Sequence, residues 1–226
     1  MHTRFDPRHP RSIVLSAPLL AALTLTFGAW LVASAFASAE VFSPQPLAAS
    51  LPAREAAPQA SSLALLFDPA VRYWQERIMT WSARFGLDPN LVATVMQIES
   101  CGDPDALSPS GAMGLFQVMP FHFSTGEDGF DPEVNAARGL SYLRLGRERG
   151  GGQPQLALAG YNGGHSRIGQ AAELWPAETR RYVYWGTGIY ADAQAGREVS
   201  PRLEEWRRAG GRWLCAQAAA ALGIAP

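Results

Sequence analysis

Apolar residues recur at intervals of three and four positions along most of the chain after residue 67, which is the spacing of one face of an α-helix. The first such stretch begins at Asp68-Pro69, a helix-capping residue followed by a proline, and stops at Gly86. Its apolar positions are Val71, Trp74, Ile78, Trp81 and Phe85. We therefore predict a single helix between Asp68 and Gly86, with this face towards the core.

The same start signal occurs at Asp88-Pro89, and the apolar face that follows it ends at Glu99-Ser100. Proline and glycine signals divide the rest of the chain. The expected elements are a short helix over 114–119, a loop over 121–130, and helices over 131–150, 155–161, from 176 onwards, 201–209 and 211–222. No stretch shows the two-residue alternation of a strand bounded by hairpin turns, so we expect a mainly α fold.

A different pattern occupies the N-terminus, where Ile13 to Phe36 runs without a charge after three arginines. Roughly 20 apolar residues can span a bilayer, so this length favours an uncleaved signal anchor. The sequence Ala37-Ser38-Ala39 fits a signal cleavage site and favours removal instead. Residues 1–39 are therefore interpreted as a cytoplasmic stub with a signal peptide or signal anchor. Both interpretations place the rest of the chain in the extracytoplasmic envelope, either membrane-anchored or secreted.

Residues 40–67 are rich in Ala, Pro and Ser and show no lasting periodicity. Such a segment buries little apolar surface, so we predict a linker. Residues 68–226 then form the folded domain, a size within the usual range of about 100–200 residues.

Composition removes several function classes. The formal net charge is −1, so no polybasic surface points to nucleic acid. His122 and His165 lie in no metal-binding motif, so we expect neither a metal nor a cofactor. The two cysteines, Cys101 and Cys215, could pair in an exported chain, and closing that loop would contribute about 4–5 kcal/mol. The alternative is a pair of buried free thiols.

Glu99 is the main candidate for chemistry because it lies on an apolar helix face. It follows Val92, Val95 and Met96 at intervals of seven, four and three residues. Burial would raise the pKa of its carboxyl group, and the negative end of the helix dipole would add to this. A carboxylic acid that stays protonated near neutral pH can act as a general acid. The alternative is a solvated glutamate at a helix end.

Three blocks of sequence carry a family resemblance. They are Glu99-Ser100 with Ala106-x-Ser108-x-x-Gly111-Ala112-x-Gly114-Leu115-x-Gln117-x-Met119-Pro120, then Ala159-Gly160-Tyr161-Asn162-Gly163-Gly164, and then Glu178-Thr179-Arg180-Arg181-Tyr182-Val183. In this order they closely resemble the soluble lytic transglycosylase (SLT) domain family over about residues 68–195. The resemblance implies a lysozyme-like, mainly helical domain that cleaves peptidoglycan glycan strands between N-acetylmuramic acid and N-acetylglucosamine.

The resemblance also implies roles for single residues. Glu99 falls on the family's catalytic acid/base. The positions expected to contact the substrate or the acid are Ser108, Ser110, Gln117, Met119, Tyr161, Asn162, Glu178 and Tyr182. For each of these the alternative role is packing or capping.

Most glycosidases use two carboxylates. Candidates for a second one here are Asp103, Asp105, Glu127, Asp128 and Asp131. The resemblance implies that none is needed and that the product carries a 1,6-anhydromuramyl end. Two other functions stay open, a hydrolytic muramidase of the goose type and a non-catalytic envelope module that binds glycan.

Overall fold

The computed structural model describes residues 62–224. The predicted signal or anchor segment and most of the predicted linker lie outside these residues. The described chain is helical and has no named strand, so the mainly α prediction is confirmed for it. Between residues 62 and 224, no helix has the length and apolarity needed to cross a membrane.

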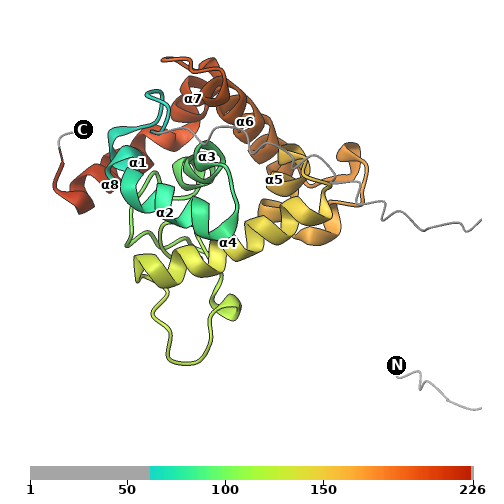
Figure 1. The fold of residues 1–226 in the computed structure, drawn as a ribbon, viewed down its shortest axis with the longest axis horizontal. Coiled ribbons are helices and arrows are strands. Elements are labelled where there is room, and N and C mark those ends of the chain that lie inside the picture. The colour runs from blue at the N-terminus through green and yellow to red at the C-terminus, as the bar shows by residue number, and fades with distance from the viewer. Residues whose placement is uncertain (1–61, 225–226) are drawn as a thin grey trace, which may run out of the picture. The chain divides into compact units, whose positions relative to one another are not determined.

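The α-helices are α1 (Pro69–Tyr73), α2 (Gln75–Phe85), α3 (Pro89–Glu99), α4 (Pro132–Arg149), α5 (Pro154–Gly163), α6 (Ala177–Gln194), α7 (Pro201–Trp206) and α8 (Arg212–Leu222). Figure 1 shows α3 at the centre of the domain, where it packs against α2 and α6. Every side chain from Leu91 to Gln97 is buried, as expected for a helix enclosed on all sides. The capping prediction for this helix is confirmed, because the Asp88 carboxylate accepts hydrogen bonds from the backbone N–H groups of Asn90 and Leu91.

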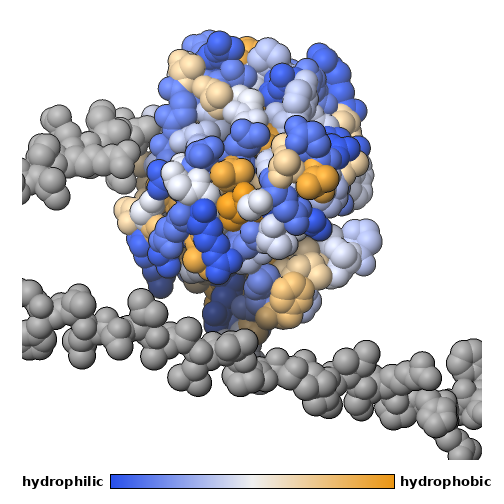
Figure 2. Space-filling view, turned by 90° about the vertical axis from the view of Figure 1, so that its right-hand side faces the viewer, coloured by the Kyte–Doolittle hydropathy of each residue, from blue (hydrophilic) through white to orange (hydrophobic). Residues whose placement is uncertain are grey.

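The surface is mainly polar where it can be followed in the space-filling view. Figure 2 shows a largely hydrophilic face on which apolar residues form small, separate groups. The apolar residues of the helix faces are instead gathered into one buried cluster around α3.

The first predicted helix is divided in two at Trp74, which has φ −88° and ψ 7°. The indole N–H of Trp74 donates a 2.8 Å hydrogen bond to the carbonyl of Gly102. The break leaves the apolar face intact, because Val71, Trp74, Ile78 and Trp81 are all buried. Periodicity predicted the face correctly and missed the break.

The core also begins before Asp68. Leu63, Leu66 and Phe67 are buried in the main hydrophobic cluster, although the composition of this segment predicts a linker. The backbone N–H of Ala64 donates to the side chain of Asn90 at the start of α3. A short apolar stretch without periodicity therefore belongs to the domain.

The predicted helix over 114–119 is wrong. Met113 and Val118 pair instead as an antiparallel bridge, with two backbone hydrogen bonds of 3.0 Å. Gly114 and Gln117 have φ values of 71° and 46°, which no α-helix contains. The segment is a tight loop held by tertiary contacts.

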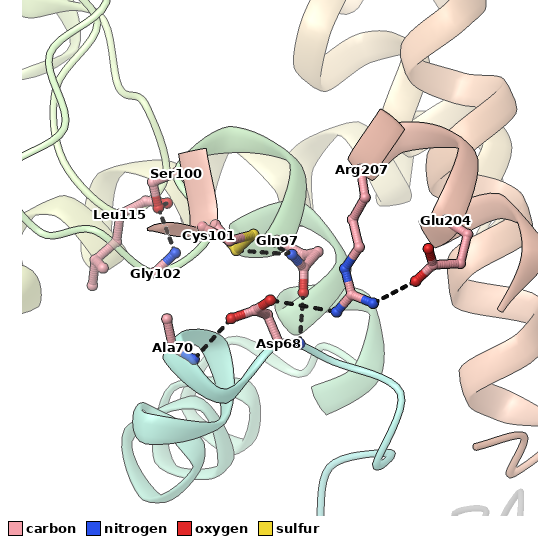
Figure 3. Close-up of a disulfide and its surroundings, with 10 residues drawn as sticks. Asp68, Ala70, Gln97, Ser100, Cys101, Gly102, Leu115, Glu204 and Arg207 are labelled. Carbon is pink, nitrogen blue, oxygen red and sulfur yellow. Dashed lines mark hydrogen bonds and ion pairs between the residues drawn. A yellow bond between two sulfur atoms is a disulfide. The ribbon is translucent and has the colours of Figure 1, made fainter. Parts of the chain in front are cut away.

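Of the two alternatives for Cys101 and Cys215, the structure has the disulfide, which joins the second residue after the end of α3 to α8. Figure 3 shows a polar network around this disulfide. The side-chain amide of Gln97 donates to the sulfur of Cys101 at 3.0 Å and accepts from the backbone N–H of Asp68 at 3.0 Å. Asp68 also pairs with Arg207 at 3.3 Å. The network ties α8 and the chain before α1 to the end of α3.

Candidate active site

Glu99 is the last residue of α3 and is partly exposed. Burial raises the pKa of its carboxyl group to about 8. A hydrogen bond from Tyr182 lowers this pKa, and the negative charge of Glu178 raises it, both by less than burial does. Glu99 therefore carries a proton at neutral pH, as a general acid requires.

Tyr182 reaches Glu99 from α6. Its hydroxyl group donates a 2.8 Å hydrogen bond to Oε1 of Glu99. The ring is buried, and burial raises the pKa of Tyr182 well above its ordinary value. The hydroxyl thus remains a donor whether Glu99 is protonated or charged.

The backbone after Glu99 is fixed by a buried serine. Ser100 donates a 2.8 Å hydrogen bond to the carbonyl of Leu115 and accepts one of 3.0 Å from the N–H of Gly102. Gly102 has φ 91°, and a Cβ atom there would lie 2.7 Å from the carbonyl oxygen of Ala70. These contacts fix the direction in which the chain leaves α3.

Asn135 of α4 holds the loop that faces Glu99. Its Oδ1 accepts from the N–H of Phe116 at 2.8 Å, and its Nδ2 donates to the carbonyls of Met113 and Gly129 at 2.7 and 2.8 Å. The side chain is fully buried. Sequence reasoning missed Asn135, although an amide among the buried positions of a helix was the signal that could have found it.

Two hollows meet beside this loop. We call the first the acid hollow; it measures about 490 Å³, and its walls include Glu99, Asp103, Asp105, Ser108 and Gln117. We call the second the aromatic hollow; it measures about 290 Å³, and its walls include Gln117, Met119, Tyr161 and Asn162. Gln117 lines both, so the hollows adjoin at this residue.

The predicted serines are placed differently from one another. Ser108 lines the acid hollow, whereas Ser110 is exposed and lines neither hollow. The two hydroxyls lie 3.0 Å apart, and Ser108 also accepts from the N–H of Ala112 at 2.9 Å. Within residues 62–224, neither hydroxyl forms a hydrogen bond with Glu99. They stabilise the loop that forms the wall.

Of the remaining predicted residues, Gln117 and Tyr161 line a hollow, whereas Glu178 does not. Gln117 donates from its side chain to the carbonyls of Ala106 and Gly114 at 3.0 and 3.1 Å, which stabilises its left-handed backbone. Tyr161 donates to the carbonyl of Phe116 at 2.7 Å while its ring lines the aromatic hollow. Glu178 is exposed on the first turn of α6, lines neither hollow and influences Glu99 through charge.

The structure places two of the five candidate second carboxylates beside Glu99 and the other three elsewhere. Asp103 and Asp105 line the acid hollow together with Glu99. Glu127 instead forms a 2.6 Å ion pair with Arg138, and Asp128 and Asp131 accept backbone hydrogen bonds in turns or at the start of α4. Only the first two are positioned near the acid.

Other residues of both hollows were not predicted. The acid hollow also contains Leu107 and, from α8, Trp213 and Gln217. The aromatic hollow also contains Phe121, His122, Arg138 and Tyr142. Trp213 could have been found from its place two positions before Cys215, because a disulfide between Cys215 and Cys101 would bring this part of the chain towards Glu99.

Among residues 62–224, one cluster has the spacing of a metal site, formed by Asp68, Cys101 and Cys215. Its two sulfur atoms are bonded to each other in the disulfide. The donors therefore do not fit a metal ion, because the thiolate ligands that such a site requires are absent.

A family model matches the part of the chain that contains Glu99. The family model described as "Transglycosylase SLT domain" matches residues 76–182, which include Glu99, Gln117 and Tyr182. Residues 76–182 are therefore similar to the SLT domain family. The SLT-type helical fold predicted from the sequence is therefore confirmed for this region.

Several curated proteins are similar to part of this chain. A transglycosylase of Enterobacteria phage PRD1 is 40% identical over 111 residues, covering 48% of this chain and 40% of the relative. Membrane-bound lytic murein transglycosylase C of Edwardsiella ictaluri (strain 93-146) is 28% identical over 162 residues, covering 52% of this chain and 45% of the relative. The chain thus spans less than half the length of these curated relatives.

A solved structure is also similar. The X-ray structure of an inactive mutant of lytic transglycosylase Slt from Pseudomonas aeruginosa matches with a TM-score of 0.44 and 24% identity. The match covers 54% of this chain and 26% of that one.

Proposed function

We propose that this chain is a peptidoglycan lytic transglycosylase. It would cleave the β-1,4 bond between N-acetylmuramic acid and N-acetylglucosamine and leave a 1,6-anhydromuramyl end. The observation that carries the proposal is Glu99, an acid with a pKa of about 8 inside a hollow of an SLT domain. The names of the aligned relatives, transglycosylase and lytic murein transglycosylase, support it.

Glu99 would act twice in one turnover. As a carboxylic acid it donates its proton to the glycosidic oxygen, and the C–O bond to the muramic sugar breaks while the substrate's acetamido group assists. The resulting carboxylate then takes a proton from the C6 hydroxyl as that oxygen attacks the anomeric carbon. The proton balance of the enzyme is restored, and no water is consumed. Tyr182 stabilises the carboxylate between the two steps through its hydrogen bond.

The two hollows would bind the glycan strand on either side of the cleaved bond. Gln117, Met119, Tyr161 and Asn162 are the proposed contacts in the aromatic hollow, and Ser108 contributes to the wall of the other. Their mixture of aromatic and polar groups suits sugars, which have apolar faces and polar edges. We include no metal and no cofactor in the proposed reaction.

The proposed location is the cell envelope, where peptidoglycan lies. The names of several relatives describe membrane-bound enzymes. The uncharged run from Ile13 to Phe36 would serve either as the anchor of this chain or as its export signal.

A hydrolytic muramidase is the second candidate, because Asp103 and Asp105 share the acid hollow with Glu99. A second carboxylate could activate water, and the product would then carry a reducing muramic end. Digestion of purified sacculi by the full-length chain, followed by mass spectrometry of the products, separates the two reactions. Anhydromuramyl ends support the proposal, and reducing ends alone contradict it.

The role of Glu99 is tested by the variant Glu99→Gln, which keeps the shape and removes the ionisable proton. The matched control is Glu173→Gln, because Glu173 is exposed and lines neither hollow. We expect Glu99→Gln to release no soluble products and Glu173→Gln to behave as the unmodified chain. Undiminished cleavage by Glu99→Gln would contradict the assignment, and a chain without cleavage in any form would favour a glycan-binding module.

A further inference from the structure

Trp213 of α8 is an exposed aromatic residue beside the candidate acid. Its relative exposure is 67%, and it lines the acid hollow that contains Glu99. Leu107, which lines the same hollow, is 64% exposed. Large apolar side chains that share a hollow and face solvent typically mark a binding surface. Trp213 lies outside the matched residues 76–182, so the family model says nothing about it.

A disulfide links the helix of Trp213 to the segment that follows Glu99. Cys215, two residues after Trp213, is bonded to Cys101, two residues after Glu99. The turn before α8 depends on Gly210, whose φ of 125° disfavours other residues. Ala218 and Ala219, on the next turn of α8, are buried in the domain. The backbone at Trp213 is therefore tied to the segment that follows Glu99, and its side chain lines the same hollow as the acid.

We propose that Trp213 is a saccharide platform, on which one sugar of the glycan strand stacks beside the bond that is cleaved. This inference rests on the proposed function. One face of a pyranose ring carries C–H groups and is apolar, so it can cover the exposed indole and remove both surfaces from water. The edges of the ring carry hydroxyl and acetamido groups. Asp103, Asp105 and Gln217 line the same hollow and provide acceptors for them.

The chemistry of the hollow favours the sugar strand over the peptide stems of peptidoglycan. Asp103 and Asp105 place negative charge beside Trp213, and this charge repels the carboxylates of acidic peptides. It does not oppose neutral N-acetylated sugars. The volume of about 490 Å³ also lies in the range of small-ligand sites.

Because the two hollows adjoin at Gln117, one glycan strand could run through both of them. Gln117 lines both, and Glu99 lies in the hollow that contains Trp213. A strand that occupies the aromatic hollow and presents its bond to Glu99 must continue into the acid hollow. Trp213 is the exposed aromatic side chain of that hollow, so it is the group on which the continuing sugar can stack.

The test uses the full-length chain carrying Glu99→Gln, which binds without turnover. Affinity for the hexamer of N-acetylglucosamine, a peptide-free probe, is measured by calorimetry with and without Trp213→Ala. We expect Trp213→Ala to weaken binding about tenfold, the effect of uncovering the part of an indole that a sugar ring shields. Trp213→Phe, which keeps an aromatic face, should restore most of the affinity. The control Tyr73→Ala removes a 59% exposed aromatic from α1, outside both hollows, and should change nothing.

Equal affinity of the Trp213→Ala and Trp213→Phe variants for the hexamer would overturn the inference, because an aromatic face would then have no role. Dependence on Trp213 for a stem peptide, but not for the hexamer, would also overturn it and identify the peptide as the occupant. Sacculus cleavage by the unmodified chain is measured separately. If that cleavage is absent while hexamer binding depends on Trp213, the proposed function fails and the platform stands.

Discussion

The hydroxyl group of Tyr182 donates a 2.8 Å hydrogen bond to Oε1 of Glu99, across 83 positions of the chain. Two opposite influences meet in this pair. Burial favours the protonated form of Glu99, whereas the hydrogen bond favours the carboxylate, and burial is the larger influence. The acid is therefore protonated at neutral pH and already has a donor in place for the anion that forms when it gives up its proton.

The first prediction concerns the alkaline limb of the pH–rate profile. Activity should fall as the pH rises through about 8, because Glu99 then loses the proton that it must donate. Tyr182→Phe removes the interaction that lowers this pKa, so the limb should move to higher pH. The rate at neutral pH should also fall about tenfold or more, since a hydrogen bond to a charged group is lost. The profile of kcat/KM on sacculi measures both changes.

An unchanged alkaline limb in Tyr182→Phe would contradict the coupling between the two residues. Tyr184→Phe is the matched control. Tyr184 lies on the same helix, is 49% exposed and lines neither hollow. Loss of the Tyr184 hydroxyl group should leave the pH–rate profile unchanged.

The second prediction is that Glu99 makes the fold less stable as the pH rises. The folded chain keeps the Glu99 proton up to about pH 8, whereas the unfolded chain releases it near pH 4.5. Because the unfolded state then binds fewer protons, the contribution of Glu99 to the free energy of unfolding decreases between these values. Glu99→Gln removes this dependence. We expect the variant to gain about 2–3 kcal/mol relative to the unmodified chain on going from pH 5 to pH 8.

Urea unfolding at the two pH values measures this difference. Glu173→Gln again provides the control, since Glu173 is exposed. A stability difference between Glu99→Gln and the unmodified chain that does not grow with pH would show that the raised pKa is absent.

The third prediction concerns the disulfide between Cys101 and Cys215. Its sulfur atoms join positions 114 residues apart, so replacing both cysteines by serine should lower the free energy of unfolding by about 4 kcal/mol. Denaturant unfolding with and without a reducing agent provides the measurement. The reducing agent should destabilise the unmodified chain and leave the double variant unchanged, and equal effects on both would contradict the prediction.

Sequence reasoning succeeded where the signal was local. Asp88-Pro89 predicted the start of α3, and the spacing of apolar residues placed Glu99 on the face that the fold encloses. Both follow from helix geometry within a few turns. The two cysteines also have one possible pairing, so the sequence named Cys101 and Cys215 as the partners but left open whether they form a disulfide.

The failures have a tertiary cause. Residues 114–119 have a sequence compatible with a helix, but Asn135 binds the N–H of Phe116 and the carbonyl of Met113 and so stabilises a loop. Trp213 joins the site through the turn at Gly210, which no short sequence pattern predicts. Partners distant in sequence determine both features.

The last prediction tests how closely the loop fits Asn135. Gly114 and Gly126 both have positive φ, at 71° and 87°, so an alanine at either position meets a similar backbone penalty of about 1–2 kcal/mol. Their surroundings differ. A Cβ atom on Gly114 would lie 2.6 Å from Nδ2 of Asn135, whereas a Cβ atom on Gly126 would have no neighbour within 4 Å.

We therefore expect Gly114→Ala to destabilise the fold by about 2 kcal/mol more than Gly126→Ala does, because Asn135 must shift and loses buried hydrogen bonds. Activity should follow the same order, since Gln117 and the walls of both hollows depend on this loop. Urea unfolding and sacculus digestion of the two variants provide the comparison. Equal losses in the two variants would mean that backbone strain alone matters and that Asn135 does not fix the loop beside Glu99.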